Sequence, residues 1–504
     1  MKTINRKPLF LALAGITALG AVGTAQAVSV SQNGLGQVLI YPYYTVKGDP
    51  NPFNTLISIV NTTASVKAVK VRFREGKASA EVYDFNLFLS GYDVWVAGLS
   101  PDTVGGGVTI STPDKSCTIP IIYGHPRTFN PASYQGDAVG DNSLARLREG
   151  YMEVIEMTTY TDADPIVGIV THVDGVPGGG CTTLTNGHNA DKIALGGDGL
   201  KGGLTGTASL VSPGSGINAA EDPVALINFR NEGELYITQT NNNERPTLAY
   251  ALPESVTATD TGEWVWVKWS DSATTDDDGI SVYAGGKDAV SAALMKNSII
   301  NEFVLDKVTL SRTDWVVTFP TKSFYVKAPT LFTVPPDVGH KNPFQRGLGS
   351  GGSCDDITIN VFDREEQLDP EASPNLRKLC WEANVVTFNN GNVFSSTNTL
   401  NIATSFENGW MLLDFHSGAN LKNNFKLVSP PEDSLAVEQN LESTEGTATF
   451  TGLPVIGFAV QTFKPPGSVS SYAGTFYHRF QSGFTEDSFC QIGTSPLNGT
   501  CGGI

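Results

Sequence analysis

The stretch Val66-Lys-Ala-Val-Lys-Val-Arg-Phe-Arg74 alternates between apolar and basic side chains over most of its length. Successive side chains of a β-strand point to opposite faces, so positions 69, 71 and 73 share an apolar face and positions 70, 72 and 74 a basic one. The pattern predicts an antiparallel strand whose apolar face is buried and whose cationic face is in water. Glu75-Gly-Lys77 then supplies a turn.

Further strand-like runs lie on both sides of this stretch, at 37–41, 55–61, 81–89 and 92–97. In the run 55–61, Leu56, Ser58 and Val60 share one face and Ile57 and Ile59 the other. Short strands separated by turns every 8–12 residues or so are typical of a β-sandwich. A second set of such runs follows residue 224. We therefore predict a mainly β fold with two antiparallel β-sandwich-like (immunoglobulin-like) modules.

One helix is expected within the second module, near residues 288–304. Asp288 can act as its N-cap, and Val290, Leu294, Ile300 and Phe303 recur at helical spacing. A chain of 504 residues is too long for one compact core. We expect a signal peptide over 1–27, an N-terminal β-sandwich module over 28–215 that ends in a glycine-rich loop, and a C-terminal β-rich module over 216–504.

The first 27 residues have the layout of a secretory signal peptide. Lys2, Arg6 and Lys7 precede an apolar run at 9–21, and Ala25-Gln-Ala27 is a small-x-small cleavage site. The apolar run is too short to span a bilayer, and no later apolar run is long enough for a transmembrane helix. The expected location is therefore extracellular or at the cell surface, with the periplasm as second choice.

The charge balance excludes one class of partner. The first 27 residues contain three basic residues and no acidic ones. Without them, the 33 Lys and Arg fall to 30 against 51 Asp and Glu, and the net charge falls from −18 to −21. Nucleic-acid binding requires basic residues that displace counterions, so no nucleic-acid partner is expected. Acidic exported proteins often hold calcium instead.

An even number of cysteines in an exported chain favours disulfide bonds. Proximity in sequence favours three pairs, although six cysteines allow other connectivities: Cys117–Cys181, Cys354–Cys380 and Cys490–Cys501.

Several segments resemble an uncharacterised family of predicted secreted proteins of Gram-negative bacteria. They read LIYPYYTV at 39–46, AVKVRFREG at 68–76, EVYDFNLFLS at 81–90, TDWVVTFPTKSFY at 313–325 and GLPVIGFAVQTF at 452–463. The resemblance implies export and a bacterial origin, and it brings no activity or catalytic residue.

No catalytic motif emerges from the chain, so no enzymatic activity and no catalytic residue is predicted. The nucleophile elbow Gly-x-Ser-x-Gly is missing, and the six histidines are scattered. His172 and His188, with Asp174, bracket the glycine-rich loop and are the candidate ligands for a transition metal.

Acidic turns are candidate calcium sites, because Ca²⁺ prefers clustered carboxylate oxygens. Two clusters stand out, with a solvated acidic turn as the competing interpretation of each: Asp271, Asp276, Asp277 and Asp278, and then Asp162 and Asp164.

Trp264 and Trp266 share one face of an aromatic strand and are candidate sugar-stacking residues. Aromatic residues in strands more often fill a core, which is the alternative.

These observations predict an exported, non-enzymatic structural or interaction protein of the bacterial cell surface, in a surface layer, matrix or appendage. Its partners would be other cell-surface proteins or further copies of itself, joined through exposed strand edges. One alternative is a carbohydrate-binding or carbohydrate-cleaving exported protein, with polysaccharide as partner. The other is an outer-membrane-associated barrel component.

Overall fold

The computed structural model describes most of the chain after residue 26. The described residues are 27–182, 184, 199–230, 246–258, 264–269, 273–275, 281–326, 342–344, 346–373, 375–415, 426–428, 449–468, 471–482, 484–485 and 491–492. The fold is mainly β, with antiparallel sheets and few helices, so the predicted fold class is confirmed.

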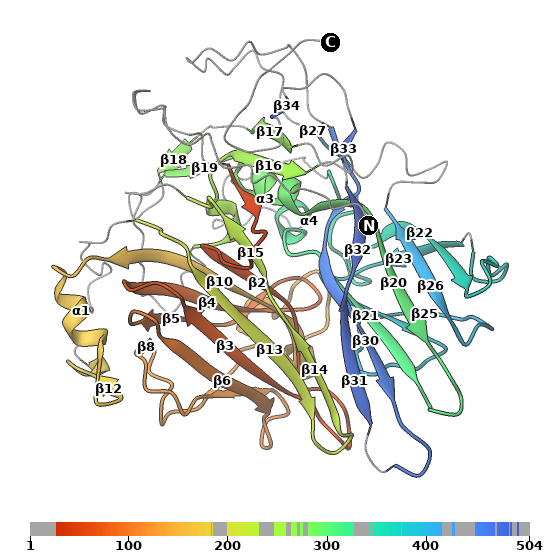
Figure 1. The fold of residues 1–504 in the computed structure, drawn as a ribbon, viewed down its shortest axis with the longest axis horizontal. Helices are drawn as coiled ribbons and strands as arrows, with labels where there is room; N and C mark the ends of the chain where they lie inside the picture. Colours follow the sequence, from red (N-terminus) through yellow and green to blue (C-terminus); the bar gives the residue numbers. More distant parts are fainter. Residues whose placement is uncertain are drawn as a thin grey trace, which may run out of the picture.

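The first sandwich packs a seven-stranded sheet on a six-stranded one (Figure 1). The seven-stranded sheet has the order β1 (Ser29–Val30), β15 (Val224–Ile227), β2 (Val38–Thr45), β10 (Glu149–Tyr160), β4 (Val66–Glu75), β5 (Glu81–Leu89) and β8 (Thr118–Ile119). The six-stranded sheet has the order β14 (Ile217–Glu221), β13 (Leu204–Ser212), β3 (Asn54–Asn61), β6 (Val94–Pro101), β7 (Val108–Ser111) and β9 (Arg127–Thr128). Between them lies a core that includes Leu39, Val71, Trp95 and Met152.

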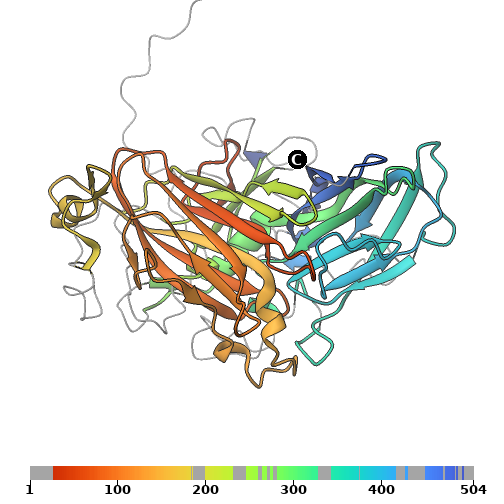
Figure 2. The same cartoon turned by 90° about the horizontal axis from the view of Figure 1, so that it is seen from below.

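The second sandwich lies beside the first (Figure 2). Its six-stranded sheet has the order β23 (Asn375–Leu379), β22 (Asp355–Asp363), β26 (Asn408–Asp414), β20 (Met295–Val304) and β29 (Leu453–Pro454), with β32 (Arg479–Ser482) also paired to β20. Its five-stranded sheet has the order β25 (Thr399–Ile402), β24 (Ala383–Phe388), β21 (Arg312–Thr318), β30 (Ile456–Phe463) and β31 (Tyr472–Tyr477).

Short elements complete the described structure. The small sheets are β11 (His172–Val173) with β12 (Val176–Pro177), β16 (Glu254–Ala258) with β17 (Trp264–Lys268) and β34 (Gln491–Ile492), β18 (Ala273–Thr275) with β19 (Ser281–Tyr283), and β27 (Lys426–Val428) with β28 (Thr449–Thr451) and β33 (Phe484–Thr485). The α-helices are α1 (Pro165–Val170), α3 (Gly286–Leu294) and α4 (Ser323–Val326); the 3-10 helices are η1 (Ala132–Tyr134), η2 (Leu144–Arg148) and η3 (Leu248–Tyr250).

The helix expected near 288–304 is present only in its first half. Helix α3 ends at Leu294, and residues 295–304 form strand β20. Strand β20 pairs with β26 over Ser298 to Val304. The prediction is wrong for residues 295–304, because the helical spacing of Ile300 and Phe303 is outweighed by sheet pairing that the local sequence does not reveal.

The basic face of β4 is buried, so the expectation that it lies in water is wrong. Lys70, Arg72 and Arg74 are 2%, 0% and 7% exposed. A segment of the middle region covers part of this face, since Arg72 Nη1 donates a 2.7 Å hydrogen bond to the carbonyl of Pro246. The strand itself is predicted correctly, but what packs on its second face is decided by residues far away in sequence.

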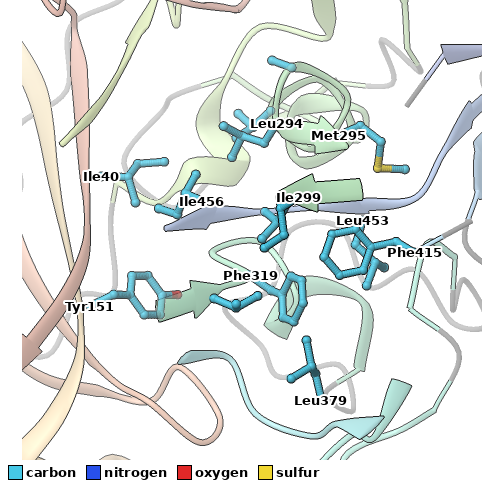
Figure 3. Packing of buried hydrophobic residues seen from close by; sticks show 14 of the residues in the cluster. Ile40, Tyr151, Leu294, Met295, Ile299, Phe319, Leu379, Phe415, Leu453 and Ile456 are labelled. Atoms are coloured by element: carbon cyan, nitrogen blue, oxygen red, sulfur yellow. The ribbon is translucent and has the colours of Figure 1, made fainter. Parts of the chain in front are cut away.

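The two sandwiches share one hydrophobic core. Figure 3 shows Ile40 and Tyr151 of the first sandwich beside Leu294, Ile299 and Phe319, which come from the second half of the chain. The Tyr151 hydroxyl also lies 3.2 Å from the carbonyl oxygen of Pro320. Strands β14 and β15, which follow residue 215, pair with β13 and β2 of the first sandwich. The sandwiches are therefore joined by packing and not by a bare linker.

Candidate functional site

The outer face of the first sandwich's six-stranded sheet has no charged side chain on β14, β13, β3, β6 or β7. Cross-strand register places Leu56 opposite Gly98, Ser58 opposite Val96 and Val60 opposite Val94. We call this surface the uncharged face. Its residues are Asn218 and Ala220; Thr205, Thr207, Ser209 and Val211; Asn54, Leu56, Ser58 and Val60; Val94, Val96, Gly98 and Ser100; and Thr109 and Ser111.

The uncharged face combines exposed aliphatic groups with hydroxyls that bond one another. Leu56, Val94 and Val96 are 49%, 46% and 37% exposed. The hydroxyls of Ser58 and Thr207 lie 3.1 Å apart at its centre. Removing water from hydroxyls that already bond each other costs little free energy, because no donor or acceptor is left without a partner. The free-energy cost of dehydrating the centre of the face is therefore small.

A second feature is a cavity of about 290 Å³ between the two sandwiches, which we call the inter-module pocket. The first sandwich contributes the loop around Asp49 and Asn51. The second contributes Arg312, at the start of β21, and Lys464, after β30. Two cations and one acid thus line a cavity in a chain whose net charge is −18.

A buried carboxylate ties together residues that adjoin the pocket lining in sequence, Lys47 before Gly48 and Ser396 after Ser395. Glu149 accepts hydrogen bonds from Lys47, Tyr43, Ser396 and Thr397 at 2.6 to 3.1 Å. Burial acts to raise the pKa of Glu149, but Lys47 and the hydrogen bonds hold that pKa below its usual value. Glu149 is therefore an ionised tie between β10 and the loop that precedes β25.

The cysteines in the described residues form the pairs expected from sequence proximity. Cys117 is bonded to Cys181, and Cys354 to Cys380. The first bond joins the edge of the seven-stranded sheet to the segment after α1. Cys490 and Cys501 lie outside the described residues, so their pairing stays a prediction.

The calcium prediction is not tested at its main cluster, because Asp271, Asp276, Asp277 and Asp278 lie outside the described residues. At the second cluster, Asp164 accepts a 3.0 Å hydrogen bond from the backbone of Thr161 and is engaged in a turn. Within the described residues, no three His, Cys, Asp or Glu side chains are grouped as a metal ion would require.

The transition-metal candidates are also only partly described. His172 lies 3.1 Å from the Ser90 hydroxyl and 3.7 Å from Asp93 Oδ2 through its Nδ1. Asp174 is exposed in the turn after β11. His188 lies outside the described residues.

Trp264 and Trp266 lie on strand β17, between β16 and β34. Their backbones are described and their side chains are not, so sugar stacking there stays a prediction. Trp269, two residues beyond Val267, is 1% exposed and belongs to the shared core.

Sequence reasoning missed both surface features because each is assembled from segments that lie far apart in the chain. The alternation of β3 reveals that Leu56, Ser58 and Val60 share a face, but not that uncharged strands lie on both sides of them. The pocket is assembled from segments between residues 48 and 471, and no local signal connects them.

Comparisons with protein-family models, with curated proteins and with solved structures return no match for this chain. Among the helices in the described part of the chain, none is long and apolar enough to cross a membrane. The uncharged face and the inter-module pocket are therefore the features that bear on function.

Proposed function

We propose that this chain is an exported, non-enzymatic interaction protein of the bacterial cell surface that associates with a second copy of itself through the uncharged face. The observation that carries the proposal is the lack of charge across five neighbouring strands, β14, β13, β3, β6 and β7, in a chain of net charge −18. Two copies of an acidic protein repel each other where their charged surfaces meet. This repulsion is smallest where both surfaces are uncharged.

Symmetry makes a second copy the occupant that fits this surface. In a two-fold dimer the same patch meets itself, so a patch without charge places no like charges opposite each other. A charged partner would gain nothing from this face, because electrostatic complementarity needs charge on both sides.

The size of the face is that of a small, reversible interface. Five strands about 4.8 Å apart, with about seven residues each at about 3.3 Å, give roughly 500 Å² per copy. The total of roughly 1,000 Å² is at the low end for a specific interface. We expect a reversible dimer that forms at micromolar concentrations.

Export is supported by the signal-like first 27 residues and by the two disulfide bonds, which persist in oxidising compartments. Protease treatment of intact cells tests the location. Peptides of this chain are expected in the released fraction, while those of a periplasmic control protein are absent. Release only after the outer membrane is opened would contradict a surface location.

Sedimentation velocity over a concentration series tests self-association of the processed protein. Leu56→Glu and Val96→Glu place new carboxylates in the face and are expected to shift the dimer to monomer. Val308→Glu is the matched control, since Val308 is 71% exposed and lies off the face. A wild-type monomer at all concentrations, or equal dimerisation of wild type and both face variants, would overturn the proposal.

A further inference from the structure

The inter-module pocket has the size of a site for one small polar ligand. Its volume of about 290 Å³ is close to the lower end of small-molecule sites, about 300 Å³. A cavity of this size has room for one substituted sugar ring. Both sandwiches line it, so it exists only when the two are assembled.

The charge of the pocket is opposite to that of the chain. Arg312 and Lys464 line it against the single acid Asp49. Arg312 is exposed and Lys464 is half-buried, whereas the fully buried cations Lys67 and Arg146 lie 2.6 Å from Glu156 and 2.8 Å from Glu75. Among the described residues, neither Arg312 nor Lys464 forms an ion pair with a carboxylate. The pocket therefore offers two cations to an anion from outside.

The remaining lining suits a hydroxyl-bearing ring. Phe53 and Val393, which are 2% and 7% exposed, supply apolar surface. Ser215, Ser395 and Ser471 also line it, and the Ser215 hydroxyl accepts a hydrogen bond from Ser212. Apolar surface with a few polar groups is the usual design of a small-ligand site, and a sugar ring presents both kinds of surface.

The pocket loops have backbone conformations that non-glycine residues rarely adopt. Leu310, Asn392 and Ser395 have φ of 47°, 34° and 53°. The Asn392 side chain holds its loop by bonding the backbone of Ser396 at 2.9 and 3.0 Å. Non-glycine residues in this region are uncommon and concentrate at ligand sites. The cluster indicates that the wall is formed before any ligand arrives.

From these observations we infer that the inter-module pocket binds a carboxylated sugar, with Arg312 and Lys464 on the carboxylate and the serine hydroxyls on the ring. Arginine suits a carboxylate because its guanidinium donates two parallel hydrogen bonds. A neutral sugar lacks the group that the two cations recognise, and acetate lacks the ring. This site is separate from the uncharged face.

Isothermal titration calorimetry with defined probes tests the inference on the full processed protein. D-glucuronate and D-galacturonate are compared with D-glucose, D-galactose and acetate. We expect at least one uronate to bind at least tenfold more tightly than its neutral counterpart and than acetate. Failure of both uronates to exceed the neutral sugars would overturn the inference, and equal binding of acetate would overturn the sugar assignment.

Variants locate the binding site. Arg312→Gln and Lys464→Gln are each expected to weaken uronate binding at least tenfold. Lys307→Gln is the matched control, because the Lys307 side chain is 84% exposed and lies outside the pocket lining. Circular dichroism checks that the three single variants and the double variant fold. Unchanged binding in the Arg312→Gln/Lys464→Gln double variant would place the ligand elsewhere and contradict the inference.

Discussion

Lys67 Nζ lies 2.6 Å from Glu156 Oε1, and neither side chain is accessible to solvent. This pair lies on the face of β4 that Val69 and Val71 share, which is turned towards the other sheet of the sandwich. On the opposite face of β4, basic residues form a ladder with acids of the neighbouring strands β5 and β10. Its rungs are Lys70–Asp84, Arg72–Glu81 and Arg74–Glu153. Burial acts to raise the pKa of Glu81, but the surrounding cations, chiefly Arg72, hold it below its usual value. The strand is therefore buried on both faces with its charges compensated.

The Lys67–Glu156 pair makes the free energy of unfolding sensitive to loss of one partner. Lys67→Met leaves the Glu156 carboxylate buried without its cation, which costs about 3–5 kcal/mol. The matched control is Lys307→Met, which breaks an exposed pair with Glu407 and should cost less than about 1 kcal/mol. Urea denaturation of both variants measures the difference. Equal losses in the two variants would contradict the buried pairing.

The shared core predicts that the two sandwiches unfold together. Ile40 belongs to the first sandwich and Ile299 to the second, yet both lie in one cluster. Each substitution, Ile40→Ala or Ile299→Ala, should cost about 2–5 kcal/mol and lower the same calorimetric transition. Two separate transitions, each shifted by only one variant, would show instead that the sandwiches are independent.

The disulfide pairs predict a specific peptide map. Proteolysis without reduction should yield linked peptides for Cys117 with Cys181 and for Cys354 with Cys380, read by mass spectrometry. Removing the second bond in a Cys354→Ala/Cys380→Ala variant should lower the free energy of unfolding by about 2–4 kcal/mol, because the unfolded chain gains freedom. A peptide that links any of these four cysteines to a different partner would contradict this connectivity.

His478 gives the protein a pH dependence with a defined sign. Burial lowers the pKa of His478 from 6.5 to about 4, although its Nε2 lies 2.9 Å from the carbonyl oxygen of Val316. Between these two pH values the unfolded chain binds a proton at this residue that the folded chain does not. The free energy of unfolding should therefore fall as the pH drops from 6.5 towards 4.

The variant His478→Gln isolates this contribution, since glutamine can still donate to Val316. Thermal unfolding from pH 8 to pH 4 should show a smaller decline in this variant than in wild type. A proton NMR titration identifies the His478 signal as the one absent from the variant. Titration of that signal at or above pH 6.5, or identical declines for the two proteins, would refute the assignment.

Local sequence patterns predict which segments form strands, but not what packs against the faces of those strands. The alternation at 66–74 predicts β4, and the run at 55–61 predicts β3. The same reasoning placed the basic face of β4 in water, because alternation reports how side chains divide between faces and not what packs on each face. The helix near 288–304 stops at Leu294 for a similar reason: pairing of β20 with β26 is a contact between distant segments.

The sequence by itself determined the mainly β class, the acidic balance and the proximity of the cysteines that pair in the described structure. These depend on composition and on period-two spacing, which act over a few residues. The tertiary structure alone decided the buried ladder of β4, the uncharged face and the inter-module pocket. Each requires side chains from strands or loops far apart in sequence to meet. Which ones meet depends on the free energy of packing the whole chain and not on any local pattern.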